Sequence, residues 1–138
     1  MLTIKGKVVH GDKRGRELGF PTANISIPES MRAYEYELDG VWAGIAELDA
    51  DNYWLTTVSI GRRPTFYNAD GEFLMEAYLL DFAGDLYGKT LNVKLYEYLR
   101  GQEKFDDIDS LVETMWGDVR ATRDLLGQTI KPVDLHSL

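Results

Sequence analysis

Strand-like hydrophobic runs recur through most of the chain. They are rich in β-branched and aromatic residues, and clusters of Gly, Pro, Asn and Asp separate them. The six runs are Ile4 to Val9, Ala23 to Ile27, Val41 to Leu48, Trp54 to Ile60, Glu72 to Asp81 and Leu91 to Leu99. This succession predicts an all-β region over about residues 1–100, arranged as an antiparallel barrel or a sandwich.

The hydrophobic spacing changes after Phe105, where apolar residues recur three and four positions apart. They are Ile108, Leu111, Val112, Met115, Val119 and Leu126. The spacing predicts one amphipathic helix over about residues 107–127, capped by Asp106 or Asp107 and packed on the barrel through its apolar stripe. Gly127 and Pro132 mark its expected end. Because no repeat or linker interrupts the sequence, we expect a single domain over residues 1–138.

Composition narrows the class of protein. The formal net charge of −8 argues against a surface that binds duplex nucleic acid, because Lys and Arg supply most of that affinity. The chain has no cysteine, which excludes disulfides and thiolate chemistry. No apolar run reaches the roughly 20 residues of a membrane span, and the N-terminus does not resemble a secretory signal. We therefore expect a soluble, cytoplasmic protein that contacts neither membrane nor nucleic acid.

The first 24 residues carry a candidate phosphate and metal site. Within residues 1–16 five basic residues face a single acid, Asp12. Glycines, Gly11 among them, punctuate the same segment, so its backbone could approach a phosphate closely. Thr22 and Asn24 follow with the same strand parity, and their neutral oxygens suit a Mg²⁺ ion that already holds phosphate. The alternatives are a solvated basic loop and two side chains that satisfy turn backbone.

Two further features combine polar groups with apolar neighbours. Glu76 lies in the run "EFLMEAYLLDF", where neither strand face has an ordinary solvent pattern. Such a carboxylate is a candidate base in a cleft, or alternatively one half of an ion pair at a wet barrel mouth. The junction "YLRGQEKFDD" places Arg100, Glu103 and Phe105 together, as a planar heterocycle would require. An ordinary strand-to-helix loop would look similar.

Taken together, these segments resemble the riboflavin kinase (flavokinase) family, the kinase module of bacterial bifunctional riboflavin kinase/FAD synthetases. The likeness covers nearly the whole chain. Its most specific parts are "GFPTAN", "RPTF" and "LLDFxGDLYGK", followed by "LRGQEKFD". It implies a six-stranded antiparallel Greek-key barrel with a C-terminal helix, which transfers the γ-phosphate of ATP to the 5′-hydroxyl of riboflavin to give FMN and ADP.

The resemblance also implies residue roles. Thr22 and Asn24 would hold Mg²⁺, and Glu76 would be the catalytic base. The ATP-binding set would be Gly11, Arg16, Thr22, Leu79, Asp81 and Tyr87. The flavin-binding set would be Glu76, Arg100, Glu103 and Phe105. We expect a monomer. No H-x-G-H motif of a nucleotidylyltransferase is present, so we do not expect this chain to make FAD by itself.

Three positions depart from the commonest pattern of that family. Trp42 stands where tyrosine is usual, Ser59 where asparagine is common, and Tyr78 where histidine is frequent. These departures leave the reaction intact and affect loop contacts. Two other classes of function stay open: a flavin- or nucleotide-binding barrel that does not turn over, and an interaction barrel of the nucleic-acid-binding kind. The acidic composition disfavours the second class.

Overall fold

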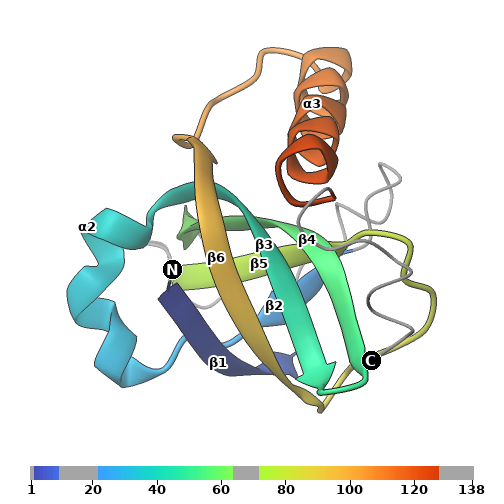
Figure 1. Ribbon diagram of the computed structural model, residues 1–138. Helices are drawn as coiled ribbons and strands as arrows, with labels where there is room; N and C mark the ends of the chain where they lie inside the picture. Colours follow the sequence, from blue (N-terminus) through green and yellow to red (C-terminus); the bar gives the residue numbers. More distant parts are fainter. Residues whose placement is uncertain (1, 10–21, 64–71, 128–138) are drawn as a thin grey trace.

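The computed structural model describes residues 2–9, 22–63 and 72–127 (Figure 1). Six strands dominate this part of the chain. They are β1 (Leu2–Val9), β2 (Ala23–Ile25), β3 (Gly40–Asp49), β4 (Asn52–Arg63), β5 (Glu72–Leu79) and β6 (Thr90–Arg100). The helical elements are η1 (Glu29–Tyr34), α2 (Glu35–Leu38) and α3 (Ile108–Leu126). All six predicted strands and the C-terminal helix are therefore present.

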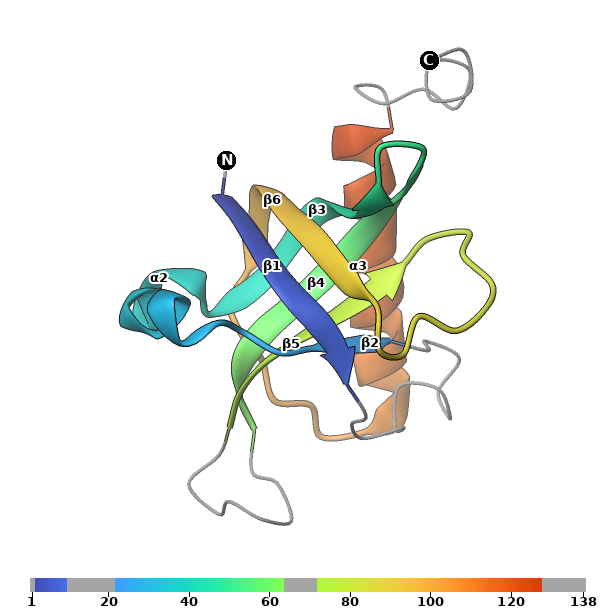
Figure 2. The same cartoon turned by 90° about the horizontal axis from the view of Figure 1, so that it is seen from below.

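The strands form a closed antiparallel barrel in the order β1-β2-β5-β4-β3-β6. β3, β4 and β5 follow one another as a meander, and β6 returns to lie beside β3, which is a Greek-key arrangement. β1 then closes the barrel by pairing with both β6 and β2. Figure 2 shows β1 crossing the near side, with α3 on the far side of the barrel. The barrel prediction is confirmed, and the sandwich alternative is wrong.

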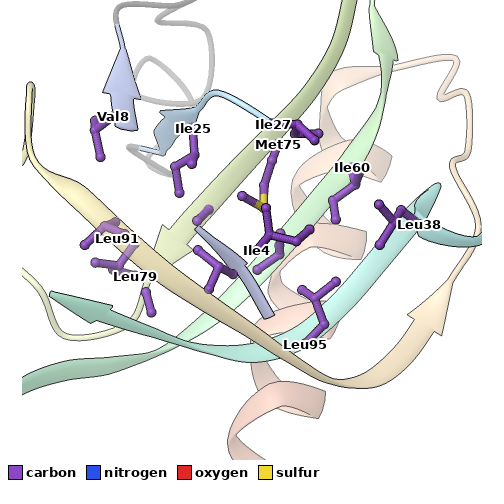
Figure 3. Packing of buried hydrophobic residues seen from close by; sticks show 14 of the residues in the cluster. Ile4, Val8, Ile25, Ile27, Leu38, Ile60, Met75, Leu79, Leu91 and Leu95 are labelled. Atoms are coloured by element: carbon purple, nitrogen blue, oxygen red, sulfur yellow. The ribbon is translucent and has the colours of Figure 1, made fainter. Parts of the chain in front are cut away.

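Alternate residues of the strands fill the barrel interior (Figure 3). On β5 the inward set is Phe73, Met75, Ala77 and Leu79, each at most 6% exposed. Their register partners on β4 include Ile60 and Val58, which are fully buried. Period-two alternation of this kind gives each strand one face for the barrel core and leaves the other face for a ligand or a helix.

The segment between β2 and β3 is helical, which the sequence pattern did not predict. η1 and α2 lie at one end of the barrel, where Leu38 is fully buried (Figure 1). The indole Nε1 of Trp42 donates a hydrogen bond of 2.9 Å to the carbonyl oxygen of Leu38. Gly40 follows with φ of 135°, and a Cβ there would lie 2.5 Å from the Tyr98 ring. This turn therefore requires glycine both for its backbone angle and for space.

α3 packs on the outer face of the barrel. Asp107 caps it by accepting a hydrogen bond of 2.7 Å from the Ser110 amide, one of the two caps expected. Val119 and Leu126 are buried against β3, β4 and β5, as the apolar stripe predicted. Ile108 is 53% exposed, so its assignment to the buried stripe is wrong: the helix begins beyond the edge of the barrel. Among the described residues, none of the helices is both long enough and apolar enough to cross a bilayer.

The interior packing generates a stability prediction. Leu95 of β6 is 1% exposed in the barrel core, whereas Leu125 of α3 is 46% exposed. Leu95→Ala should lower the free energy of unfolding by about 2–5 kcal/mol, because it leaves a cavity in a packed core. Leu125→Ala, the same chemical change, should alter it by less than about 0.5 kcal/mol. Urea denaturation of both variants measures the difference, and equal losses would contradict this description of the core.

Candidate active site

Three polar side chains form a row across neighbouring strands. Glu76 on β5 is the register partner of Asn24 on β2 and of Ser59 on β4. Residues directly opposite each other on paired strands project to the same side of the sheet, about 5 Å apart. Since Met75 and Ala77, the neighbours of Glu76, face the barrel core, the row lies on the outer face. The fold therefore brings together three residues that are far apart in the sequence.

Helix α3 explains why Glu76 has apolar neighbours on its own face of β5. Tyr78 and Leu80 share that face and pack against Val119, Val112 and Met115 of α3. Glu76 itself is half-buried. Helix α3 thus covers the end of the outer face of β5 at Tyr78 and Leu80, and Glu76 lies next to this covered end. The prediction that neither face of this strand is an ordinary solvent face is confirmed.

Asn24 and Thr22 lie at the start of β2, next to Glu76. Asn24 is 9% exposed, and within the described part of the chain no hydrogen bond involves its side-chain amide. Burial of an amide costs free energy unless the amide is hydrogen-bonded. Thr22, two residues earlier and just outside the strand, is half-buried. Both have neutral oxygen atoms, which is the chemistry predicted for the metal ligands.

Arg100, at the end of β6, joins the barrel to α3. Its Nε and Nη2 donate hydrogen bonds of 3.0 and 2.8 Å to the carboxylate oxygens of Asp118. This hydrogen-bonded carboxylate raises the pKa of the Arg100 guanidinium. The Asp118 side chain is 11% exposed and that of Arg100 23%, so water screens this pair little. Two parallel N–H donors on one carboxylate also fix the orientation of both groups.

The same guanidinium lies beside the other predicted flavin residues. Its Cζ is 6.0 Å from the centroid of the Phe105 ring, at the limit of a cation–π contact. Its Nη1 donates to the Gly101 carbonyl at 3.1 Å and is 3.9 Å from a Glu103 carboxylate oxygen. The structure thus brings Arg100, Glu103 and Phe105 together in the segment that joins β6 to α3. Nε and Nη2 of Arg100 already donate to Asp118. A ligand would therefore contact the flat face of the guanidinium or its remaining N–H groups.

The predicted ATP residues occupy different places. Leu79 is 6% exposed and belongs to the barrel core. Asp81 follows it with φ of 61° and is exposed, and Arg123 of α3 donates to it at 3.0 and 3.1 Å. That contact lowers the pKa of Asp81. Tyr87, 52% exposed, lies in the β5–β6 connection. Gly11 and Arg16 lie outside the described residues.

Sequence reasoning missed the polar residues through which α3 binds the barrel. Asp118 and Thr122 are buried on the packed face of the helix, and Thr122 Oγ1 lies 2.7 Å from Thr57 Oγ1 of β4. Arg123 of α3 also binds Asp81 in the turn after β5, and Gln102, in the segment before α3, binds β4. The available signal was their spacing, since Asp118, Thr122 and the apolar Val119 and Leu126 fall on one side of a helix. This spacing was overlooked because Asp118 and Thr122 are polar, and the search was for apolar residues.

The described residues form a closed six-stranded barrel with the row Asn24, Glu76 and Ser59 on its outer face and helix α3 packed on the same face. The family model described as "Riboflavin kinase" (Flavokinase) matches residues 1–126. The chain belongs to the riboflavin kinase family. It is 38% identical over 122 residues to a bifunctional riboflavin kinase/FMN adenylyltransferase of Pseudomonas fluorescens, covering 88% of this chain and 37% of that protein. It therefore spans well under half the length of this relative.

Two solved structures share the fold. A riboflavin kinase from Trypanosoma brucei superimposes with a TM-score of 0.66 at 28% identity, covering 94% of this chain and 80% of that one. A structure described as a macrolide-efflux protein from Streptococcus pneumoniae gives a TM-score of 0.72 at 34% identity, covering 88% of this chain and 38% of that one. The barrel with its C-terminal helix is thus common to the family and to both structures.

The two ion pairs of α3 generate a second prediction. Asp118→Asn should destabilise the fold by about 1–3 kcal/mol, because it leaves the Arg100 guanidinium half-buried without its carboxylate. Asp81→Asn removes the partner of Arg123, where both groups are exposed, and should change stability by less than about 1 kcal/mol. Chemical denaturation of the two variants compares a buried with an exposed pair. Equal small effects would show that Arg100–Asp118 contributes no more than a surface contact.

Proposed function

We propose that this riboflavin kinase domain transfers the γ-phosphate of Mg-ATP to the 5′-hydroxyl of riboflavin, releasing FMN and ADP. The observation that carries the proposal is the register that pairs Glu76 with Asn24. It puts a carboxylate and a candidate metal ligand side by side on the outer face of the barrel. An acceptor hydroxyl and a metal-bound phosphate could therefore meet there.

The residues beside Glu76 fit a magnesium ion. Thr22 and Asn24 offer neutral oxygens, and the buried Asn24 amide has no hydrogen bond to another described residue. Mg²⁺ commonly takes only one or two protein ligands and completes its shell with water and substrate phosphates. When bound, the ion would neutralise charge on the transferred phosphoryl group. The basic residues near the N-terminus, Arg16 among them, would also neutralise phosphate charge.

On the other side of Glu76, the segment after β6 supplies the flavin side of the site. Phe105 offers a ring for stacking, and Arg100 and Glu103 offer polar contacts beside it. In the transfer, the riboflavin O5′–H bond breaks and its proton passes to the Glu76 carboxylate. O5′ forms a bond to the γ-phosphorus as the bond to the bridging oxygen of ADP breaks. Phosphoryl transfer depends mainly on such positioning and charge neutralisation.

Leu79, Asp81 and Tyr87 complete the proposed nucleotide side at the end of β5 and in the following connection. A cytoplasmic location and a monomeric state stay predictions from the sequence. The second candidate function is a barrel that binds flavin or nucleotide without turnover. One assay separates the two: incubation with riboflavin, ATP and Mg²⁺, followed by chromatographic detection of FMN. Binding of riboflavin without FMN would favour the second candidate.

Glu76→Gln tests the proposed base. The amide is nearly isosteric with the carboxylate and cannot accept the hydroxyl proton. General-base assistance contributes roughly 10²- to 10⁴-fold, and a loose transition state needs the proton removed late, so we expect a loss of about 10²-fold in the single-turnover rate. Affinities for both substrates should change little. Glu113→Gln, the same change on the exposed face of α3, is the control, and a wild-type rate for Glu76→Gln would assign Glu76 a structural role.

Asn24→Ala tests the metal side. Loss of one oxygen ligand should raise the Mg²⁺ concentration for half-maximal activity by about 10-fold or more, and excess Mg²⁺ should restore part of the rate. Thr22→Ala should act in the same direction. Asn92→Ala, the same change on β6 away from Glu76, should leave the Mg²⁺ dependence unchanged. A normal Mg²⁺ titration for both Asn24→Ala and Thr22→Ala would refute the proposed metal ligands.

A further inference from the structure

Gln102 connects the segment after β6 to the strand beside Glu76. Its side-chain Nε2 donates hydrogen bonds of 3.0 Å to Ser59 Oγ and 2.9 Å to the Ile60 carbonyl oxygen of β4. A carbonyl oxygen can only accept, so the nitrogen of the amide must face β4. Both N–H groups of that nitrogen are then used, and the orientation of the side chain is fixed.

The surroundings of Gln102 are shaped for this contact. The residue after Ile60 is Gly61, where an added Cβ would lie 3.1 Å from Gln102 Nε2 and 3.4 Å from its Cγ. A side chain at position 61 would therefore press against the amide. β3 begins at Gly40, opposite Ile60, so the Gln102 amide reaches β4 where its pairing with β3 ends.

The contact lies next to the proposed base. Ser59, which accepts from Gln102, is the register partner of Glu76.

The segment of residues 101–107 is consequently held at three points. Arg100 binds Asp118 of α3 at its start, and Asp107 caps α3 at its end. Gln102 supplies the third point, which is the one on the barrel face itself. Glu103 and Phe105 lie between these anchors. The distance between Phe105 and Glu76 therefore depends on whether the segment is held against β4 or only by α3.

We infer that Gln102 is a positioning residue, which holds the flavin-binding segment against β4 so that Phe105 and Glu76 meet the same ligand. The inference rests on the proposed function. Gln102 contacts the Ser59 side of Glu76, whereas Asn24 lies on the other side. Gln102 should therefore affect flavin binding but not nucleotide binding, and it takes no part in proton transfer.

Gln102→Ala should raise the riboflavin Kd, measured by quenching of flavin fluorescence, and the riboflavin KM by about 3- to 10-fold. That range corresponds to the free energy of ordering about one residue of the loosened segment when riboflavin binds. The KM for ATP, kcat at saturating substrates and the melting temperature should stay close to wild type. Gln102→Glu keeps the shape of the side chain but turns an acceptor toward the Ile60 carbonyl oxygen. It should therefore weaken riboflavin binding at least as much as Gln102→Ala does. Asn92→Ala is the matched control.

Separate outcomes distinguish the inference from the function on which it rests. A wild-type chain that neither binds nor phosphorylates riboflavin overturns both. A wild-type chain that binds riboflavin, with an unchanged riboflavin Kd in Gln102→Ala and Gln102→Glu, overturns the inference alone. Equal losses for riboflavin and ATP together with a lowered melting temperature would show that Gln102 is merely structural, which also overturns it.

Discussion

The ion pair between Arg100 and Asp118 holds α3 against the barrel. The strands bury the barrel interior among themselves, and α3 covers part of the outer face. The hydrogen bonds from Arg100 to Asp118 fix α3 to the last strand, while Thr57 and Thr122 add a second polar contact. The helix then covers Tyr78 and Leu80 and leaves Glu76 at its border. Burial makes the pair directional and makes the loss of either partner costly.

In this arrangement the two faces of each strand have different roles. On β5, Met75 and Ala77 build the core, while the residue between them, Glu76, projects to the outer face. The rigid core fixes the position of the row Asn24, Glu76 and Ser59 through main-chain pairing, without any contact among the three side chains being needed. Side chains on paired strands are placed more accurately than side chains on loops. The segment after β6 has no such support, which is why its side-chain anchors matter.

Much of this architecture follows from the sequence, and the exceptions have physical reasons. Alternation on β5 and the apolar spacing of α3 depend on local periodicity, so both were predictable. The η1–α2 segment was missed because a short helical turn with one buried residue, Leu38, leaves no periodic signal. Asp118 was missed because a polar residue on a helix is ordinarily solvated. Asn24 and Glu76 were candidates from the sequence, but their adjacency depends on the pairing of β2 with β5, which only barrel closure determines.

The shortness of β2 has a consequence for how the barrel responds to its ligands. β2 has three residues, and its register with β1 comprises two residue pairs. Sheet order leaves it as the link through which the barrel closes between β1 and β5. Among the described residues, its pairing with β1 is the shortest in the barrel. Local opening in proteins favours such regions. A ligand held by Asn24 would bind the closed seam and not the open one, so by mass action it would shift the barrel toward closure as its concentration rises. Binding of such a ligand and closure of the barrel would then be two aspects of one equilibrium.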